Sequence, residues 1–264
     1  MIFRQNLTEW LRKANNPCPH PGEPPMTTVK STVDRLVVAL DVPTAEEAVS
    51  LARRLKGRVG MFKVGLELFC AQGPAFIREV QAFAPVFLDL KLHDIPTTVH
   101  RALNALLPLD PALIDVHTQG GPAMVEAAAE AVRAHRQRGG RTRLLGVTVL
   151  TSLDREALTR LGLATDPGDM ALHLARLAKE CGCDGVVCSA QEAGAVRDAC
   201  GEDFHRLTPG IRPRGGAVQD QARVVTPAQA LRDGSTWLVV GRPITRADDP
   251  AAAADAILAE MSEA

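Results

Sequence analysis

The chain has 264 residues, of which 46% are hydrophobic, and a formal net charge of −1. This length allows one large core or two small ones. The near-neutral charge argues against a general nucleic-acid or membrane-surface binder. No apolar run reaches the roughly 18 residues of a membrane-spanning helix, and no apolar segment typical of a secretory signal follows the charges at the N-terminus.

The cysteines do not form a recognisable metal or disulfide pattern. Cys181 and Cys183 are the only close pair, and no paired CxxC motif exists. A disulfide framework is not expected in a chain of this size. We therefore predict reduced, mostly buried thiols in a cytoplasmic protein.

Residues 1–33 differ from the rest of the chain. The run 15–25 (NNPCPHPGEPP) contains five prolines, which exclude a helix or a central strand. Residues 1–13 could form one short amphipathic helix, and Met26 stands just before a segment typical of a domain start. We expect residues 1–33 to be a disordered extension and residues 34–264 to be the folded domain. Whether the extension is genuine, or a mistaken or vector-derived start, stays open.

From Asp34 onward, strand-like and helix-like segments alternate regularly. The predicted strands are 35–42, 61–69, 86–92, 113–118, 144–150, 185–189, 206–211 and 237–240. The predicted helices are 44–56, 74–83, 97–107, 122–138, 155–161, 167–181, 191–200, 226–233 and 250–262. Thr44 and Glu47 form a capping-box pattern at the first helix. Eight β-α units in this length indicate an α/β protein with a single (β/α)8 TIM barrel. The alternative, a doubly wound sheet, lacks its G-x-G-x-x-G motif after the first strand.

The most informative stretch is 86–99, VFLDLKLHDIPTTV. It begins as a buried strand, and Asp89, Lys91 and Asp94 then interrupt the apolar pattern. Residues i and i+2 of a strand point the same way, so Asp89 and Lys91 should share a face. Charge on a buried strand is costly unless it is paired or used. A structural ion pair is the plainer explanation, but we favour a functional site.

Polar residues also follow the other predicted strands. A barrel of this type has its active site at the C-terminal ends of the strands. The residues at those ends are Asp41, Lys63, Asp89, Lys91, His117, Thr151, Ser189, Arg212 and Arg242. His117 and Ser189 are expected to have structural hydrogen-bonding roles, and His93 to support the site without reacting.

The last two strands suggest an anion site. Thr208–Arg212 (TPGIR) follows the seventh strand, and Gly241–Ile244 (GRPI) follows the eighth. Loops at these positions commonly bind phosphate in this fold, and arginine suits phosphate geometry. The glycine-containing segment 214–221 lies between them and could close over a ligand. The sequence therefore predicts a small phosphorylated substrate.

Six segments together carry a family resemblance. VALDV, FKVGLELF, DLKLHDIPTT, VTVLTS, TPGIR and VGRPIT, in this order from Arg35 onward, resemble the orotidine 5'-phosphate decarboxylase family in its bacterial form. The resemblance implies removal of CO2 from orotidine 5'-phosphate without a cofactor or metal. The product would be UMP, at the last step of pyrimidine nucleotide synthesis, and the enzyme would be a homodimer.

The resemblance also implies roles for individual residues. Lys91 would protonate C6, Asp89 would face the substrate carboxylate, and Lys63 would link to Asp89. Asp41 and Lys63 would hold the ribose hydroxyls, and Asp94 and Thr98 would reach the partner subunit's site. The implied substrate contacts are Asp41, Lys63, Asp89, Leu90, Lys91, Leu92, His93, Asp94, Ile95, Pro96, Thr97, Thr98, Thr151, Arg212, Gln221, Gly241 and Arg242. Thr151 would bind the pyrimidine edge, Gln221 would bridge base and phosphate, and Arg212, Gly241 and Arg242 would complete the phosphate site.

Two alternatives remain open from the sequence. A Mg2+-dependent ketogulonate-phosphate decarboxylase or hexulose-phosphate synthase shares the Asp-x-Lys-x-x-Asp strand. A catalytically silent phosphate-binding barrel, acting as a sensor, would bind UMP without turnover.

Overall fold

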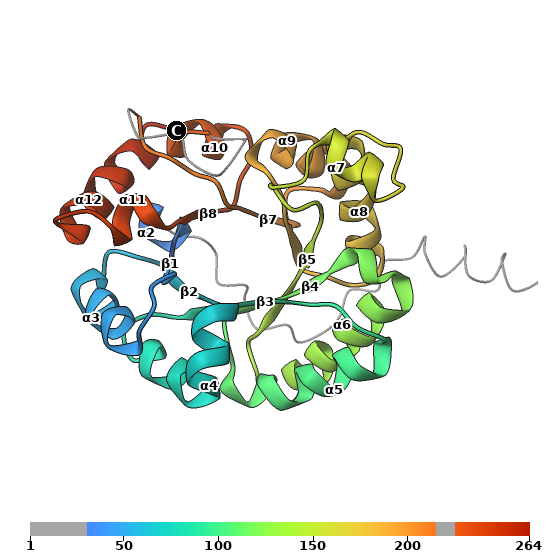
Figure 1. Cartoon of the computed structure of the whole chain (residues 1–264), viewed down its shortest axis with the longest axis horizontal. Coiled ribbons are helices and arrows are strands. Elements are labelled where there is room, and N and C mark those ends of the chain that lie inside the picture. The colour runs from blue at the N-terminus through green and yellow to red at the C-terminus, as the bar shows by residue number, and fades with distance from the viewer. Residues whose placement is uncertain (1–30, 215–224) are drawn as a thin grey trace, which may run out of the picture. The chain divides into compact units, whose positions relative to one another are not determined.

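A computed structural model describes residues 31–214 and 225–264. Eight parallel strands pair in chain order and close into a barrel, with helices outside it (Figure 1). The strands are β1 Leu36–Ala39, β2 Met61–Gly65, β3 Val86–Leu92, β4 Leu113–His117, β5 Arg143–Val147, β6 Gly185–Val187, β7 His205–Thr208 and β8 Trp237–Val240. The predicted single (β/α)8 TIM barrel is confirmed.

The helices alternate with these strands. They are α2 Thr32–Arg35, α3 Ala45–Leu55, α4 Leu66–Gln81, α5 Pro96–Leu106, α6 Pro122–Gln137, α7 Arg155–Arg160, α8 Pro167–Glu180, α9 Ala190–Cys200, α10 Pro227–Arg232, α11 Arg242–Thr245 and α12 Pro250–Met261, with short 3-10 turns at Leu107–Leu109 and Thr118–Gly120. Thr44 caps α3 as predicted, its side chain accepting the Glu47 N–H at 3.2 Å. Proline at the first position begins α5 and four later helices, where its missing N–H costs nothing.

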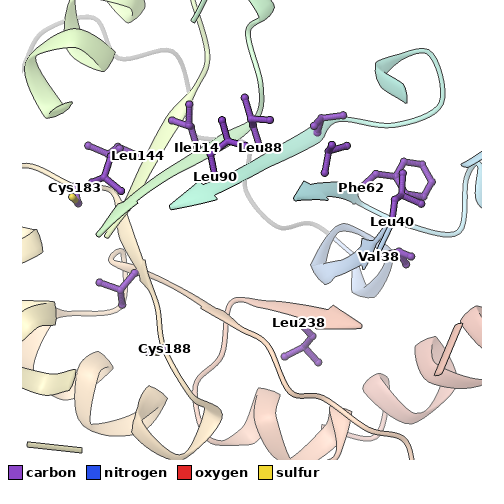
Figure 2. Packing of buried hydrophobic residues seen from close by; sticks show 14 of the residues in the cluster. Val38, Leu40, Phe62, Leu88, Leu90, Ile114, Leu144, Cys183, Cys188 and Leu238 are labelled. Carbon is purple, nitrogen blue, oxygen red and sulfur yellow. The ribbon is translucent and has the colours of Figure 1, made fainter. Parts of the chain in front are cut away.

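Most of the core lies between the strands and the helices. Alternate strand residues such as Leu88, Leu90 and Ile114 join one buried cluster with apolar residues of the helices (Figure 2). The residues between them, such as Phe87 and Asp89, line a cavity at one end of the barrel. The period of two along each strand therefore separates packing residues from site residues.

The second β-α unit differs from the sequence-based expectation. The strand predicted over 61–69 ends at Gly65, and α4 begins at Leu66 rather than at Pro74. Leu68 is buried while Leu66 and Glu67 are exposed, which is the burial of a helix and not of a strand. Gly73, at φ 70°, marks a kink just before Pro74, so the proline begins only the second part of this helix.

Smaller differences lie at other element ends. Strands β5 and β7 stop at Val147 and Thr208, so the cavity residues Thr151 and Arg212 lie in the loops that follow them. Two short helices, α2 and α11, were not predicted. Helix α2 begins with a capping box at its N-terminus, in which Ser31 Oγ accepts the Asp34 N–H and the Asp34 side chain accepts the Ser31 N–H. Residues 31–33, expected to belong to the extension, are thus part of a capped helix.

Some predictions fall outside the described residues. These are the extension over residues 1–30 with its possible helix, most of the 214–221 loop, and Gln221. In the described part, Cys70, Cys181, Cys183, Cys188 and Cys200 are free thiols, and all but Cys70 are buried. No helix within residues 31–214 and 225–264 is long and apolar enough to cross a membrane.

Candidate active site

A cavity of about 440 Å3 opens at the C-terminal ends of the barrel strands. Its lining contains these predicted site residues: Asp41, Lys63, Asp89, Lys91, Thr151, Arg212, Gly241 and Arg242. They come from six different β-α units, so only the closed barrel brings them together. The volume lies in the range typical of small-molecule sites, roughly 300–1,000 Å3.

Four charged side chains alternate in sign at the β1–β3 side of this cavity. Lys63 Nζ lies 3.0 Å from Asp41 Oδ1 and 3.2 Å from Asp89 Oδ2. Lys91 Nζ forms an ion pair with the other oxygen of Asp89. Asp89 is thus held between two ammonium groups, and the predicted sharing of one face by Asp89 and Lys91 is confirmed.

The surroundings fix the charge of the two central groups. Burial raises the pKa of Asp89, but Lys63 and Lys91 outweigh it and bring this pKa down to about 2. Burial lowers the pKa of Lys63, but Asp89 and Asp41 outweigh it and leave this pKa above its usual value. At neutral pH the carboxylate and the ammonium are therefore both ionised.

The backbone at Lys91 is not that of a regular strand. Lys91 has φ 48°, in the left-handed region that residues with a side chain rarely occupy. The pairing of β3 with β4 shifts register between Leu88 and Leu92. The Lys91 N–H donates to Oδ1 of Asp115, on β4, at 2.8 Å. The charged end of β3 is thus a bulge that re-aims a side chain.

The part of the cavity that follows β7 and β8 carries arginine. Arg212 follows β7 and is 7% exposed, with its Nη1 donating to the Ile211 carbonyl at 2.9 Å. Arg242 is the first residue of α11, directly after β8. Both line the same cavity as Lys91, as does Arg246. This placement suits an anionic group bound at a distance from the lysines.

The remaining predicted residues lie elsewhere. Asp94, Ile95, Thr97 and Thr98 are exposed on this chain, and the Asp94 side chain accepts the Ile95 N–H at 2.6 Å. Leu90 is buried in the core cluster, with Leu92 packed against it. His93 lies against His117, with ring centroids 5.3 Å apart. None of these residues, nor Pro96, lines the 440 Å3 cavity.

Ser189 has a structural role, as expected. Its side chain accepts the Gln191 N–H, and Glu192 accepts the Ser189 N–H, so Ser189 begins α9 with a capping box.

Three residues near the site were not predicted. Asp115 is fully buried beside Lys91, and a charge inside the apolar segment 113–118 was the signal that could have revealed it. Cys188 and Arg246 line the cavity. Arg246 follows the VGRPIT motif by one residue, but Cys188 gave no sequence signal beyond its place at a strand end.

Across the two described ranges, no group of three or more His, Cys, Asp or Glu side chains is arranged to hold a metal ion. The acidic residues of the cavity, Asp41 and Asp89, are paired with lysines.

Comparison with known proteins identifies the family. Residues 34–257 match the model of the orotidine 5'-phosphate decarboxylase / HUMPS family. Orotidine 5'-phosphate decarboxylases from Nitrosococcus oceani and Halorhodospira halophila are 48% and 51% identical, covering 86% and 87% of this chain and 97% of each relative. A crystal structure of the Lactobacillus acidophilus enzyme of that name superposes with a TM-score of 0.75 at 37% identity, covering 86% of this chain and 98% of that one. The chain therefore belongs to the orotidine 5'-phosphate decarboxylase / HUMPS family.

Proposed function

We propose that this protein decarboxylates orotidine 5'-phosphate to UMP and CO2, without a metal or cofactor, in pyrimidine nucleotide synthesis. The observation that carries the proposal is one cavity that combines the Asp41–Lys63–Asp89–Lys91 array from β1–β3 with two arginines that follow β7 and β8. Such a cavity suits a substrate with a phosphate at one end and a reacting carboxylate at the other. Relatives that carry this activity in their names support it.

Lys91 supplies the proton in this mechanism. When the bond from C6 to the carboxylate breaks, CO2 leaves and its electron pair stays on C6. The Lys91 ammonium stabilises that negative charge and then transfers a proton to C6, and solvent reprotonates the resulting amine. Lys91 is suited to this because Asp89 holds its Nζ in place by an ion pair.

Asp89 faces the departing carboxylate. Its two neighbouring lysines keep it ionised, so the substrate carboxylate binds beside a fixed negative charge, and the repulsion between the two is relieved as that carboxylate leaves as CO2. Lys63 and Asp41 hold the ribose hydroxyls. Arg212, Arg242 and the backbone at Gly241 hold the phosphate, whose binding energy is used to orient the reacting carbon. Thr151 binds the pyrimidine edge.

The site is completed by a second copy of the chain. Asp94 and Thr98 are exposed and do not line their own cavity. Ile95 between them is 66% exposed, which is unusual for a large apolar side chain. In a homodimer with two-fold symmetry, this segment covers the partner's cavity, and each chain donates Asp94 and Thr98 to the other.

The test is the loss of orotidine 5'-phosphate absorbance after treatment of the protein with EDTA. Full activity with chelator present is the expected result. Activity restored only by Mg2+, on a sugar phosphate, would instead assign the chain to the ketogulonate-phosphate or hexulose-phosphate type. Binding of UMP with no turnover of orotidine 5'-phosphate would indicate a sensor.

A further inference from the structure

We infer that Asp115 is a positioning residue for Lys91, holding the backbone bulge that aims the lysine ammonium at the reacting carbon. The inference rests on the proposed function, because Lys91 is the proton donor there. Asp115 itself does not line the cavity, so its role is exerted through Lys91.

The bulge and Asp115 occupy matching places on neighbouring strands. Leu88 pairs with Ile114 and Leu92 pairs with Val116, so three residues of β3 face the single residue Asp115 of β4. The extra residues leave the regular ladder, and the Lys91 N–H donates to Oδ1 of Asp115 at 2.8 Å. The Asp115 side chain therefore supplies an acceptor at the place where the pairing is irregular.

The conformation of Lys91 needs such a support. A φ of 48° costs free energy for a residue with a side chain, and it persists only where the surroundings determine it. Without an acceptor, the Lys91 N–H lies beside a fully buried strand position, where an unsatisfied donor is costly. A relaxed backbone at Lys91 would carry its Nζ away from Asp89.

The second oxygen of Asp115 lies 4.0 Å from Lys91 Nζ. Burial, with the nearby negative charge of Asp89, raises the pKa of Asp115 well above its usual range. One oxygen of Asp115 accepts from the Lys91 backbone, and the other lies toward the charged array. An asparagine has the same shape and keeps an acceptor oxygen, with an amide group in place of the second oxygen.

The test compares Asp115→Asn with Asp115→Val in the full-length protein. Asp115→Asn should keep kcat within about threefold of the wild type, because the acceptor remains. Asp115→Val should lower kcat roughly a hundredfold, the order of loss that a misplaced catalytic group causes, while UMP affinity changes less than about threefold. If Asp115 only stabilised the fold, its replacement would not lower kcat a hundredfold while leaving UMP affinity nearly unchanged.

Asp184→Ala is the matched control. Asp184 also accepts the N–H of a residue on a neighbouring strand, Leu144, at 2.7 Å, but it precedes β6 at the other end of the barrel. The Asp184→Ala substitution should lower the melting temperature and leave kcat unchanged.

Several outcomes would overturn the inference. One is a folded Asp115→Val protein with wild-type kcat. Another is a folded Asp115→Asn protein that loses more than tenfold in kcat, and this second variant decides the matter if Asp115→Val does not fold. Inactivity of the wild-type protein on orotidine 5'-phosphate would instead contradict the proposed function.

Discussion

Lys63 and Asp89 form a buried ion pair, with Nζ 3.2 Å from Oδ2 and side chains only 11% and 9% exposed. A buried pair of this kind gains little net free energy over apolar residues, but removing one partner leaves the other charge buried with only its second neighbour, Asp41 or Lys91. Substitution of either residue is therefore expected to lower the free energy of unfolding, independently of any effect on catalysis.

A double-mutant cycle measures this cost. Lys63→Met and Asp89→Leu should each lower the free energy of unfolding by about 2 kcal/mol, because the remaining buried charge loses one of its two partners and keeps only Lys91 or Asp41. The double variant should lose at least ~1 kcal/mol less than the sum of the two. Urea denaturation of the four proteins gives the numbers.

The exposed pair of Arg54 and Asp249 is the control for this cycle. Its side chains are 48% and 63% exposed, at a separation of 3.4 Å. Arg54→Ala and Asp249→Leu should show a coupling of no more than about 1 kcal/mol. Strict additivity for Lys63 and Asp89 would show that their pairing contributes nothing to the fold.

Arg242→Ala tests the phosphate site. It should reduce kcat/KM for orotidine 5'-phosphate roughly ten- to a hundredfold, because a hydrogen bond to a charged group is lost. Orotidine without the phosphate should be turned over equally by both proteins. Arg138→Ala, at an exposed arginine after α6, serves as the control. An equal loss with both substrates would indicate that Arg242 does not bind phosphate.

A mixed dimer tests the shared site. Lys91→Ala and Asp94→Ala homodimers should each be nearly inactive, but a hybrid contains one intact site and one doubly altered site. Random exchange makes half of the dimers hybrids, so mixing equal amounts should restore roughly a quarter of wild-type activity. If a tagged pull-down confirms exchange and no activity returns, Asp94 acts within its own chain.

His205, at the start of β7, should make stability depend on pH. It is 8% exposed and lies against Trp237. Burial, with Arg143 nearby, lowers the pKa of His205 to about 4. The unfolded chain binds this proton near pH 6.5 and the folded chain only near pH 4, so stability should fall by up to ~3 kcal/mol as the pH drops through this window.

His205→Gln removes the titrating group and should flatten the fall in stability between about pH 6.5 and pH 4. His173→Gln, at an exposed histidine of α8, is the matched control and should leave the wild-type dependence in place. Urea midpoints across this range provide the comparison. An unchanged pH dependence in His205→Gln would show that His205 is not responsible.

The barrel could be predicted because its signals are local. Apolar runs of strand length, proline at helix starts and the Thr44 cap each depend on a few adjacent residues. The end of β2 was misplaced because the apolar residues Leu66, Leu68 and Phe69 suit either a strand or a helix, and only the packing of Leu68 decides for a helix.

The site was predicted less completely, because part of it depends on contacts between strands. Asp89 and Lys91 could be assigned to one face from their spacing. The left-handed backbone conformation of Lys91 could not be predicted, because it involves a hydrogen bond to Asp115, 24 residues later in the chain. The position of Asp94 outside its own cavity follows from the bend at Asp94 before α5 begins at Pro96; the proline indicates the end of the strand but not the direction the chain then takes.

Release of CO2 from carboxyl-labelled orotidine 5'-phosphate, by chelator-treated wild-type and Lys91→Ala proteins, tests the central claim most directly. Lys56→Ala, at an exposed lysine after α3, is the control and should behave as the wild type. The wild type should release one CO2 for each UMP formed, whereas Lys91→Ala should bind UMP but release almost none. No CO2 from the wild type, or more than about a tenth of its rate from Lys91→Ala, would contradict the account.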